Sequence, residues 1–208
     1  MNRKWTIMSL LLLVFMLSGM PVAGAEVAND WQCVPNERVG PVTRQTTGDD
    51  LIRLFGAENV QRRTVLGAEG AERFEVSVIY PDTPNQALLY WQNNRYGEIP
   101  SAVSIRGAGT AWRTVYNITI GTSLEEMNGI NGGNFVISGF GWDYGGLVKS
   151  WNDGALANVK GLFLTFRPAR SLPREFQGDG VRIDSGNPEL LPDGVKVAEV
   201  YIVLNGSR

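Results

Sequence analysis

The chain has 208 residues, of which 43% are hydrophobic and 19% are charged, with 25 glycines and 10 prolines. These values are typical of a globular domain with its own core, and they exclude a disordered, collagen-like or coiled-coil chain. The formal net charge of −2 leaves no excess of cations to neutralise a phosphate backbone, so nucleic acid is not an expected partner.

The scarcity of histidine and cysteine excludes several kinds of chemistry. The sequence has no histidine and a single cysteine, Cys33. Histidine-based catalytic triads, zinc sites built from histidine or clustered cysteines, and disulfides within the chain are therefore excluded. We expect no cofactor and no bound metal.

Residues 1–25 have the pattern of a secretory signal peptide. Arg3 and Lys4 precede an apolar stretch at 5–20, and the small residues at 23–25 form a cleavage site. The mature chain is expected to begin at Glu26 and to be periplasmic or secreted. Since the apolar stretch is shorter than the roughly 20 residues that a spanning helix needs, we expect no transmembrane span in the mature chain.

Cys33 lies inside the mature chain instead of at its first position, where a lipoprotein carries its lipid-bearing cysteine. A lone thiol in an oxidising compartment either pairs with a second chain or is buried as a small hydrophobic side chain. The apolar neighbours Trp31 and Val34 favour burial.

A short helix is the first element with a clear start and end. The polar, proline-punctuated segment 26–46 predicts an extended lead-in with one strand near 39–43. Thr47 and Asp50 then have the spacing of a capping pair. Apolar residues at one helical face follow, and Gly56 marks the end of the helix. The residues of that face are Leu51, Leu54 and Phe55.

A meander of strands is predicted after this helix. Residues 72–80 alternate between apolar and polar with the period of two that a strand requires. Pro81 and Pro84 interrupt the pattern, and two further strands are expected at 88–91 and 103–106.

The second half of the chain has the same order of elements. Thr122 and Glu125 have the spacing of a capping box, which predicts a second short helix. Residues 152–154, Asn-Asp-Gly, carry the strongest hairpin signal in the chain. Strands are expected at 135–138, 140–144, 147–151, 161–166 and 196–204.

The two halves, at about 38–106 and 112–170, align as units of one short helix and one meander. Aligning Leu51 with Leu124 and Gly56 with Gly129 brings the helices into register, although the caps do not superpose. Two capped helices that precede strands also look alike without any duplication. The sequence leaves a two-fold tandem repeat open.

The predicted fold class is α+β, with antiparallel sheet meanders and two short helices packed on one side. It forms a single exported domain over 26–208, completed by a C-terminal strand at about 196–204.

Asp143 is the most notable carboxylate of the sequence. It lies between Trp142 and Tyr144, where aromatic side chains favour both sugar binding and a raised carboxyl pKa. Glycoside cleavage needs only two carboxylates, so a hydrolase of envelope polysaccharide with Asp143 as the acid is the alternative function. A second acidic group does not match the calcium-loop pattern and is interpreted as a solvated loop. It consists of Asp179, Asp184, Glu189 and Asp193.

The candidate binding residues are Trp142, Asp143, Tyr144 and Trp151. Phe140, Trp142 and Tyr144 recur with a period of two, which favours a buried strand face with Asp143 directed to water. In the alternative, Trp142 and Trp151 form an exposed stacking platform across a hairpin.

Four segments of the chain, at 39–43, 50–60, 121–125 and 139–146, resemble a family of uncharacterised exported bacterial proteins and lipoproteins. The likeness covers about Val39 to Phe166, and its most specific part is the sequence GFGWDYGG at 139–146. No activity is assigned to that family, so the resemblance implies no site residues.

A more distant likeness concerns the fold. A short helix, such as Gly-Thr-Ser-Leu-Glu-Glu-Met at 121–127, is followed by a meander, and this order occurs twice in the chain. The arrangement is similar to the tandem fold of the β-lactamase inhibitory protein and of small outer-membrane assembly lipoproteins. That resemblance implies protein binding by a concave sheet surface. We therefore expect a non-enzymatic exported domain that binds a protein or a cell-envelope component.

Overall fold

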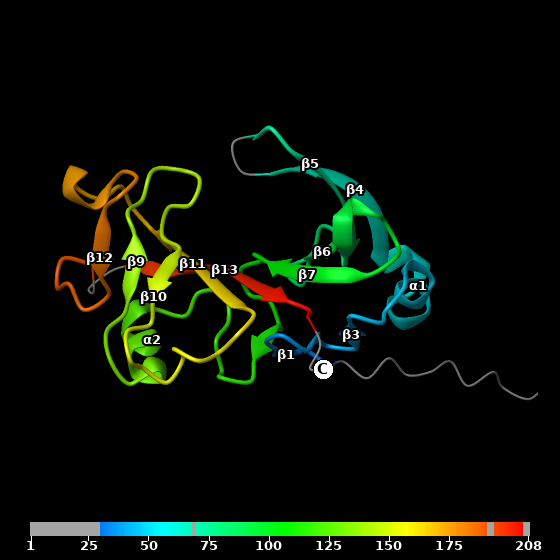
Figure 1. The fold of residues 1–208 in the computed structure, drawn as a ribbon, viewed down its shortest axis with the longest axis horizontal. Helices are drawn as coiled ribbons and strands as arrows, with labels where there is room; N and C mark the ends of the chain where they lie inside the picture. Colours follow the sequence, from blue (N-terminus) through cyan, green and yellow to red (C-terminus); the bar gives the residue numbers. More distant parts are fainter. Residues whose placement is uncertain (1–29, 68–69, 191–193, 206–208) are drawn as a thin grey trace, which may run out of the picture.

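A six-stranded antiparallel sheet runs through the middle of the molecule (Figure 1). The computed structural model describes residues 30–67, 70–190 and 194–205; the predicted signal peptide and Asp193 lie outside these residues. The strand order is β11-β13-β7-β6-β5-β4. The strands are β4 (Val60–Leu66), β5 (Arg73–Ile79), β6 (Ala87–Trp91), β7 (Pro100–Ile105), β11 (Leu162–Pro168) and β13 (Val195–Val203).

Two smaller sheets flank this central sheet. One has the order β3-β2-β1-β8, in which only the β1–β8 pair is parallel, and the other has the order β10-β9-β12. A bridge between Leu147 and Thr165 joins β10 to β11. The bounds are β1 (Gln32–Val34), β2 (Arg38–Val39), β3 (Val42–Thr43), β8 (Arg113–Thr114), β9 (Val136–Ser138), β10 (Val148–Ser150) and β12 (Arg182–Asp184). The fold is α+β with mostly antiparallel sheets, as predicted.

Helix α1 (Gly48–Phe55) begins and ends where the sequence predicts. Thr47 Oγ1 accepts a hydrogen bond from the Asp50 N–H, and the Asp50 carboxylate accepts one from the Thr47 N–H. The backbone hydrogen bond from Thr47 is the largest cause of the lowered pKa of Asp50. Gly56, with φ of 85°, ends the helix.

Helix α2 (Leu124–Asn131) begins one residue later than predicted. Its capping box is formed by Ser123 and Glu126, so the assignment to Thr122 and Glu125 is wrong. Thr122 cannot serve as the cap because its Oγ1 accepts a hydrogen bond from the Thr119 N–H at 3.1 Å.

The turns that lead into the two helices have matching hydrogen bonds. The Thr43 N–H donates to Thr46 Oγ1 at 2.9 Å, as the Thr119 N–H does to Thr122 Oγ1. In both turns the second threonine also donates its N–H to the carbonyl of the first, at 3.2 Å. The two helices are therefore preceded by the same kind of turn, while the tandem repeat itself stays an open hypothesis.

The glycines that end the helices correct the register of that repeat. Gly132 ends α2 with φ of 73°, so it holds the position that Gly56 holds at the end of α1. Gly129, to which the sequence aligned Gly56, lies inside α2. A duplication of the two halves stays a hypothesis, and its alignment now sets Gly56 on Gly132.

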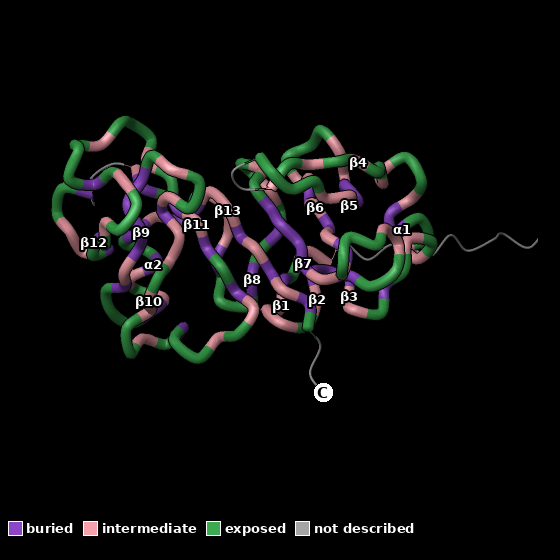
Figure 2. Tube along the Cα trace, turned by 45° about the horizontal axis from the view of Figure 1, so that its top comes forward, coloured by how far each residue is buried: buried purple, intermediate pink, exposed green. Residues whose placement is uncertain are grey.

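Both helices contribute to one hydrophobic core. Leu51 and Phe55 of α1 and Leu124 and Met127 of α2 are buried in it, and Leu54 packs against it. Figure 2 shows buried positions gathered along β7, β11 and β13. The predicted packing of the helices on the sheet is therefore confirmed.

No helix within the described ranges combines the length and the apolar composition needed to cross a membrane.

Two predicted elements of the second half are wrong. Residues 140–144 form turns instead of a strand, because Gly141 and Gly146 adopt φ of 84° and 75°. The turn at 152–154 does not close a hairpin, because β10 pairs with β9 and β11 pairs with β13. The buried Asn131 amide instead fixes this loop: its Nδ2 donates to the Trp151 carbonyl and its Oδ1 accepts from the Leu156 N–H.

The other predicted strands are confirmed as β5, β6, β7, β9, β10, β11 and β13. The segment near 39–43 is the tight hairpin of β2 and β3 instead of one strand. Strand β4 escaped prediction because Gln61, Arg62 and Arg63 are polar residues on an exposed edge strand. Strand β12 lies in the segment interpreted as an acidic loop.

Cys33 is buried, as predicted, with 1% of its surface exposed. Burial raises the pKa of its thiol from 9.0 to about 12.

We expect iodoacetamide to label Cys33 rapidly only after unfolding in urea, as followed by mass spectrometry. Because the unfolded chain releases this proton first, the thiol also makes stability fall as the pH rises from about 9 toward 12. Rapid labelling of the native protein at pH 8 would contradict this expectation.

Candidate functional site

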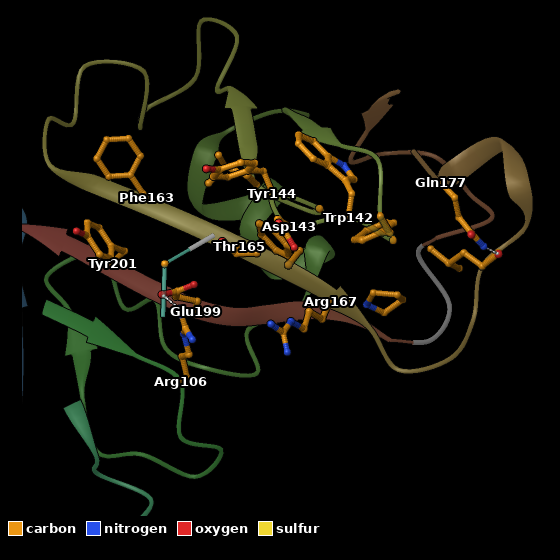
Figure 3. A pocket seen from close by; sticks show the side chains of 18 of the residues that line it. Arg106, Trp142, Asp143, Tyr144, Phe163, Thr165, Arg167, Gln177, Glu199 and Tyr201 are labelled. Carbon is orange, nitrogen blue, oxygen red and sulfur yellow. Dashed lines mark hydrogen bonds and ion pairs between the residues drawn. The ribbon is translucent and has the colours of Figure 1, made fainter. Parts of the chain in front are cut away.

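A groove of about 1330 Å³ lies on the face of the central sheet opposite the core (Figure 3). Strands β11 and β13 form its floor, together with Arg106 at the end of β7. One wall is the segment 140–147, and Leu66 at the end of β4 borders the other side. The groove thus lies between the glycine-rich segment and the β4–β5 hairpin.

Strand alternation decides which side chains reach the floor. In β11, Phe163, Thr165 and Arg167 line the groove, whereas Leu164 is buried in the core. Phe166 is buried as well and borders the groove from beneath the glycine-rich segment. In β13, Glu199 and Tyr201 line it.

Four aromatic rings form a stripe across this face of the sheet, which we call the aromatic stripe: Phe163, Tyr201, Tyr90 and Phe74. The ring centroids of successive members are 6.3, 5.9 and 5.9 Å apart. Tyr201 and Tyr90 meet across β7, where the small residues Ala102 and Ser104 pair with them. The stripe therefore begins in the groove and continues onto β6 and β5.

The charged side chains of the floor differ in their partners. Glu199 accepts hydrogen bonds from Ser104 Oγ and, at 2.8 Å, from Arg106 Nη2. Arg167 is exposed and makes no ion pair with any residue of the described chain. Burial, with smaller contributions from Tyr90 and Glu199, raises the pKa of Tyr201 to about 12. Tyr201 is therefore a neutral hydrogen-bonding group at physiological pH.

The glycine-rich segment places Trp142 and Tyr144 on the wall of the groove (Figure 3). The Trp142 Nε1–H donates to the Gly139 carbonyl at 2.8 Å, and its ring meets that of Tyr144 edge to face at 5.4 Å. Trp142 is half-buried and Tyr144 is 45% exposed. Only Phe140 is buried, so the predicted buried face of three aromatics is wrong: in turns, alternate residues do not share a face.

Trp151 does not join the other three candidate binding residues. Its ring packs on Phe135 at a centroid distance of 5.0 Å, against the core, and it does not line the groove. A stacking platform of Trp142 and Trp151 is therefore wrong as well. The third candidate, Asp143, is exposed and lines the groove together with Glu199.

One member of the acidic group of the C-terminal part, Asp184, holds local structure together. Asp184 Oδ1 accepts hydrogen bonds from Asn134 Nδ2 and from the Gly186 N–H. In the part of the chain that the structure describes, no three Cys, Asp or Glu side chains gather as a possible metal site.

Sequence reasoning missed the floor of the groove. Phe74, Tyr90, Phe163 and Tyr201 all fall in predicted strands, but their meeting depends on the order of the strands in the sheet. A signal was present, since alternate positions of β11 carry an aromatic, a hydroxyl and a guanidinium group on one face.

No protein-family model matches the chain, and no match is found among curated proteins or solved structures. The resemblances drawn from the sequence stay predictions, and the function is argued from the groove itself.

Proposed function

We propose that the chain is an exported, non-enzymatic domain that binds a protein or a cell-envelope component in the groove. The observation that carries this proposal is the aromatic stripe, which begins in the groove and lies partly open on the sheet face. Export itself rests on the signal-peptide pattern of residues 1–25.

The distribution of exposed apolar side chains supports a binding surface here. Among the described residues, seven large hydrophobic side chains are exposed, and three of them, Leu66, Tyr144 and Phe163, line this groove. A cluster of exposed apolar groups rimmed by polar ones is typical of an interaction site. Tyrosine, tryptophan and arginine are also the residue types that dominate binding energy at protein interfaces.

We expect Phe163→Ser to abolish binding of the natural partner, because it removes the most exposed ring of the stripe. The purified protein would be immobilised and exposed to a cell-envelope extract of the source bacterium, and retained proteins and peptidoglycan would be identified by mass. The wild type should retain a partner that the Phe163→Ser variant does not.

Tyr116→Ser is the matched control, since Tyr116 is an exposed aromatic residue outside the groove. It should retain the partner like the wild type. Equal retention by Phe163→Ser would show that the groove is not the binding site, and a wild type that retains nothing would remove the basis of the proposal.

The alternative function, a carboxylate-dependent hydrolase of envelope polysaccharide, is favoured by one observation. Among the residues that the structure describes, Asp143 and Glu199 are the two carboxylates that line the groove. Glu199 is held in place by hydrogen bonds from Arg106 and Ser104, and glycoside cleavage needs two positioned carboxylates. Incubation with purified peptidoglycan tests this directly: release of soluble sugars that is lost in Asp143→Asn and in Glu199→Gln would establish the hydrolase in place of the binding domain.

A further inference from the structure

The orientation of the aromatic rings indicates which class of partner the groove binds. In the groove, the Phe163–Tyr201 pair meets at 73° and the Trp142–Tyr144 pair at 65°. Farther along the aromatic stripe, the Tyr90–Tyr201 pair is tilted at 51° and the Phe74–Tyr90 pair meets at 75°. In an edge-to-face pair, the edge of one ring covers one face of its neighbour, and the two rings enclose a notch. A sugar ring stacks on a flat aromatic face, whereas a notch between rings suits the side chain of a protein.

The floor changes character along β11. Phe163 with Tyr201 lies at one end, Thr165 with Glu199 in the middle, and Arg167 at the other end (Figure 3). Phe163 and Arg167 are four residues apart on one strand face, roughly 13 Å. An extended peptide has the same rise per residue, so two of its side chains four positions apart span the same distance.

The charged side chains that line the groove in the described chain are Arg106 and Arg167 together with the carboxylates Glu199 and Asp143. Arg106 is paired with Glu199 through their 2.8 Å contact, but Arg167 has no ion-pair partner among the described residues. An unpaired guanidinium group beside an apolar surface favours a carboxylate in the ligand, which it binds through charge-assisted hydrogen bonds. The size of the groove, about 1330 Å³, exceeds the range of roughly 300 to 1,000 Å³ that is usual for small-molecule sites.

From these observations we infer that the groove binds an extended protein segment with an apolar side chain and, about four residues from it, a carboxylate. The apolar side chain lies in the notch between Phe163 and Tyr201, and the carboxylate pairs with Arg167. This inference rests on the proposed binding function and names the chemistry of the partner.

Selection of phage-displayed random dodecapeptides on the immobilised protein tests the inference. Enriched peptides should share an apolar residue and, about four positions away, an aspartate or glutamate. One enriched peptide and its amide counterpart, with Asn or Gln in place of the acid, are then titrated by fluorescence anisotropy. Arg167→Gln should weaken binding of the acidic peptide about tenfold, the factor expected for one charge-assisted hydrogen bond, and leave the amide peptide unaffected.

Lys149→Gln removes the same charge from an exposed position outside the groove and should change neither affinity. Arg167→Glu should restore binding to a peptide that carries lysine at the acidic position. Equal weakening of both peptides by Arg167→Gln, or enriched peptides without a common acid, would overturn the inference.

Peptidoglycan glycan strands serve as the second probe in the same titration. If they bind in a manner that Phe163→Ser abolishes while no peptide is enriched, the inference fails and the proposed binding function stands. If neither peptides, glycan strands nor envelope proteins are retained, both fail.

Discussion

Replacing Phe140 by alanine is expected to lower the free energy of unfolding by about 3 to 5 kcal/mol, whereas Trp142→Ala should lower it by only about 1 kcal/mol. Phe140 is 6% exposed and belongs to the hydrophobic core, so its removal leaves a cavity. Trp142 is half-buried at the wall of the groove and loses chiefly the hydrogen bond from its Nε1 to the Gly139 carbonyl.

The urea midpoints of the two variants measure this difference. A large loss for Trp142→Ala together with a small one for Phe140→Ala would restore the buried strand face that the sequence pattern favours. The same pair also separates stability from binding, because Trp142→Ala should stay folded while it weakens the wall of the groove.

Local signals predicted the helices well and failed in the glycine-rich segment. A helix start is fixed by hydrogen bonds between residues three apart, so Thr47 and Asp50 were sufficient to place α1. For α2, the sequence offered two pairs with the same spacing, Thr122 with Glu125 and Ser123 with Glu126. Only the contact of Thr122 with the Thr119 N–H decides between them, and that contact exists only in the folded turn.

The segment 139–146 misled because period two has meaning only in extended backbone. The backbone at Gly141 and Gly146 has positive φ values and is not extended. Glycine adopts positive and negative φ about equally readily, so the sequence alone does not determine these angles. Glycine was nevertheless informative. A Cβ at Gly139 would lie 2.6 Å from the Gly178 carbonyl oxygen, so the glycine allows this backbone to pack closely.

The candidate site could be predicted only in part, because it is assembled from distant segments. Trp142, Asp143 and Tyr144 were found as one motif, but they form a single wall. The floor combines β11 with β13, whose pairing shifts in register between Thr165 and Phe166, and Arg106, which follows β7. Such a site follows from strand order, which local periodicity does not encode.

Gly146 is the point where the glycine-rich segment is joined to the floor of the groove. Its carbonyl accepts a 2.8 Å hydrogen bond from the Phe166 N–H of β11, and its own N–H donates to the carbonyls of Ser138 and Gly139. A Cβ at this position would lie 2.1 Å from the Phe166 carbonyl oxygen, and the backbone has φ of +75°. A side chain here therefore conflicts both with its own backbone conformation and with a fixed neighbouring strand.

Gly146→Ala is accordingly expected to lower the free energy of unfolding by roughly 2 to 3 kcal/mol. The left-handed backbone accounts for about 1 to 2 kcal/mol and the loss of the hydrogen bond to Phe166 for about 1 kcal/mol more. Gly129→Ala is the matched control: it lies inside α2 with open space around it, so alanine should raise stability by about 0.5 to 1 kcal/mol through its better helix propensity. Urea unfolding of both variants measures the contrast. Because the wall moves when this joint is strained, Gly146→Ala should also weaken partner binding under conditions in which it remains folded. If the Gly146→Ala variant is as stable as the wild type, the glycine-rich segment is not anchored to β11 at this residue.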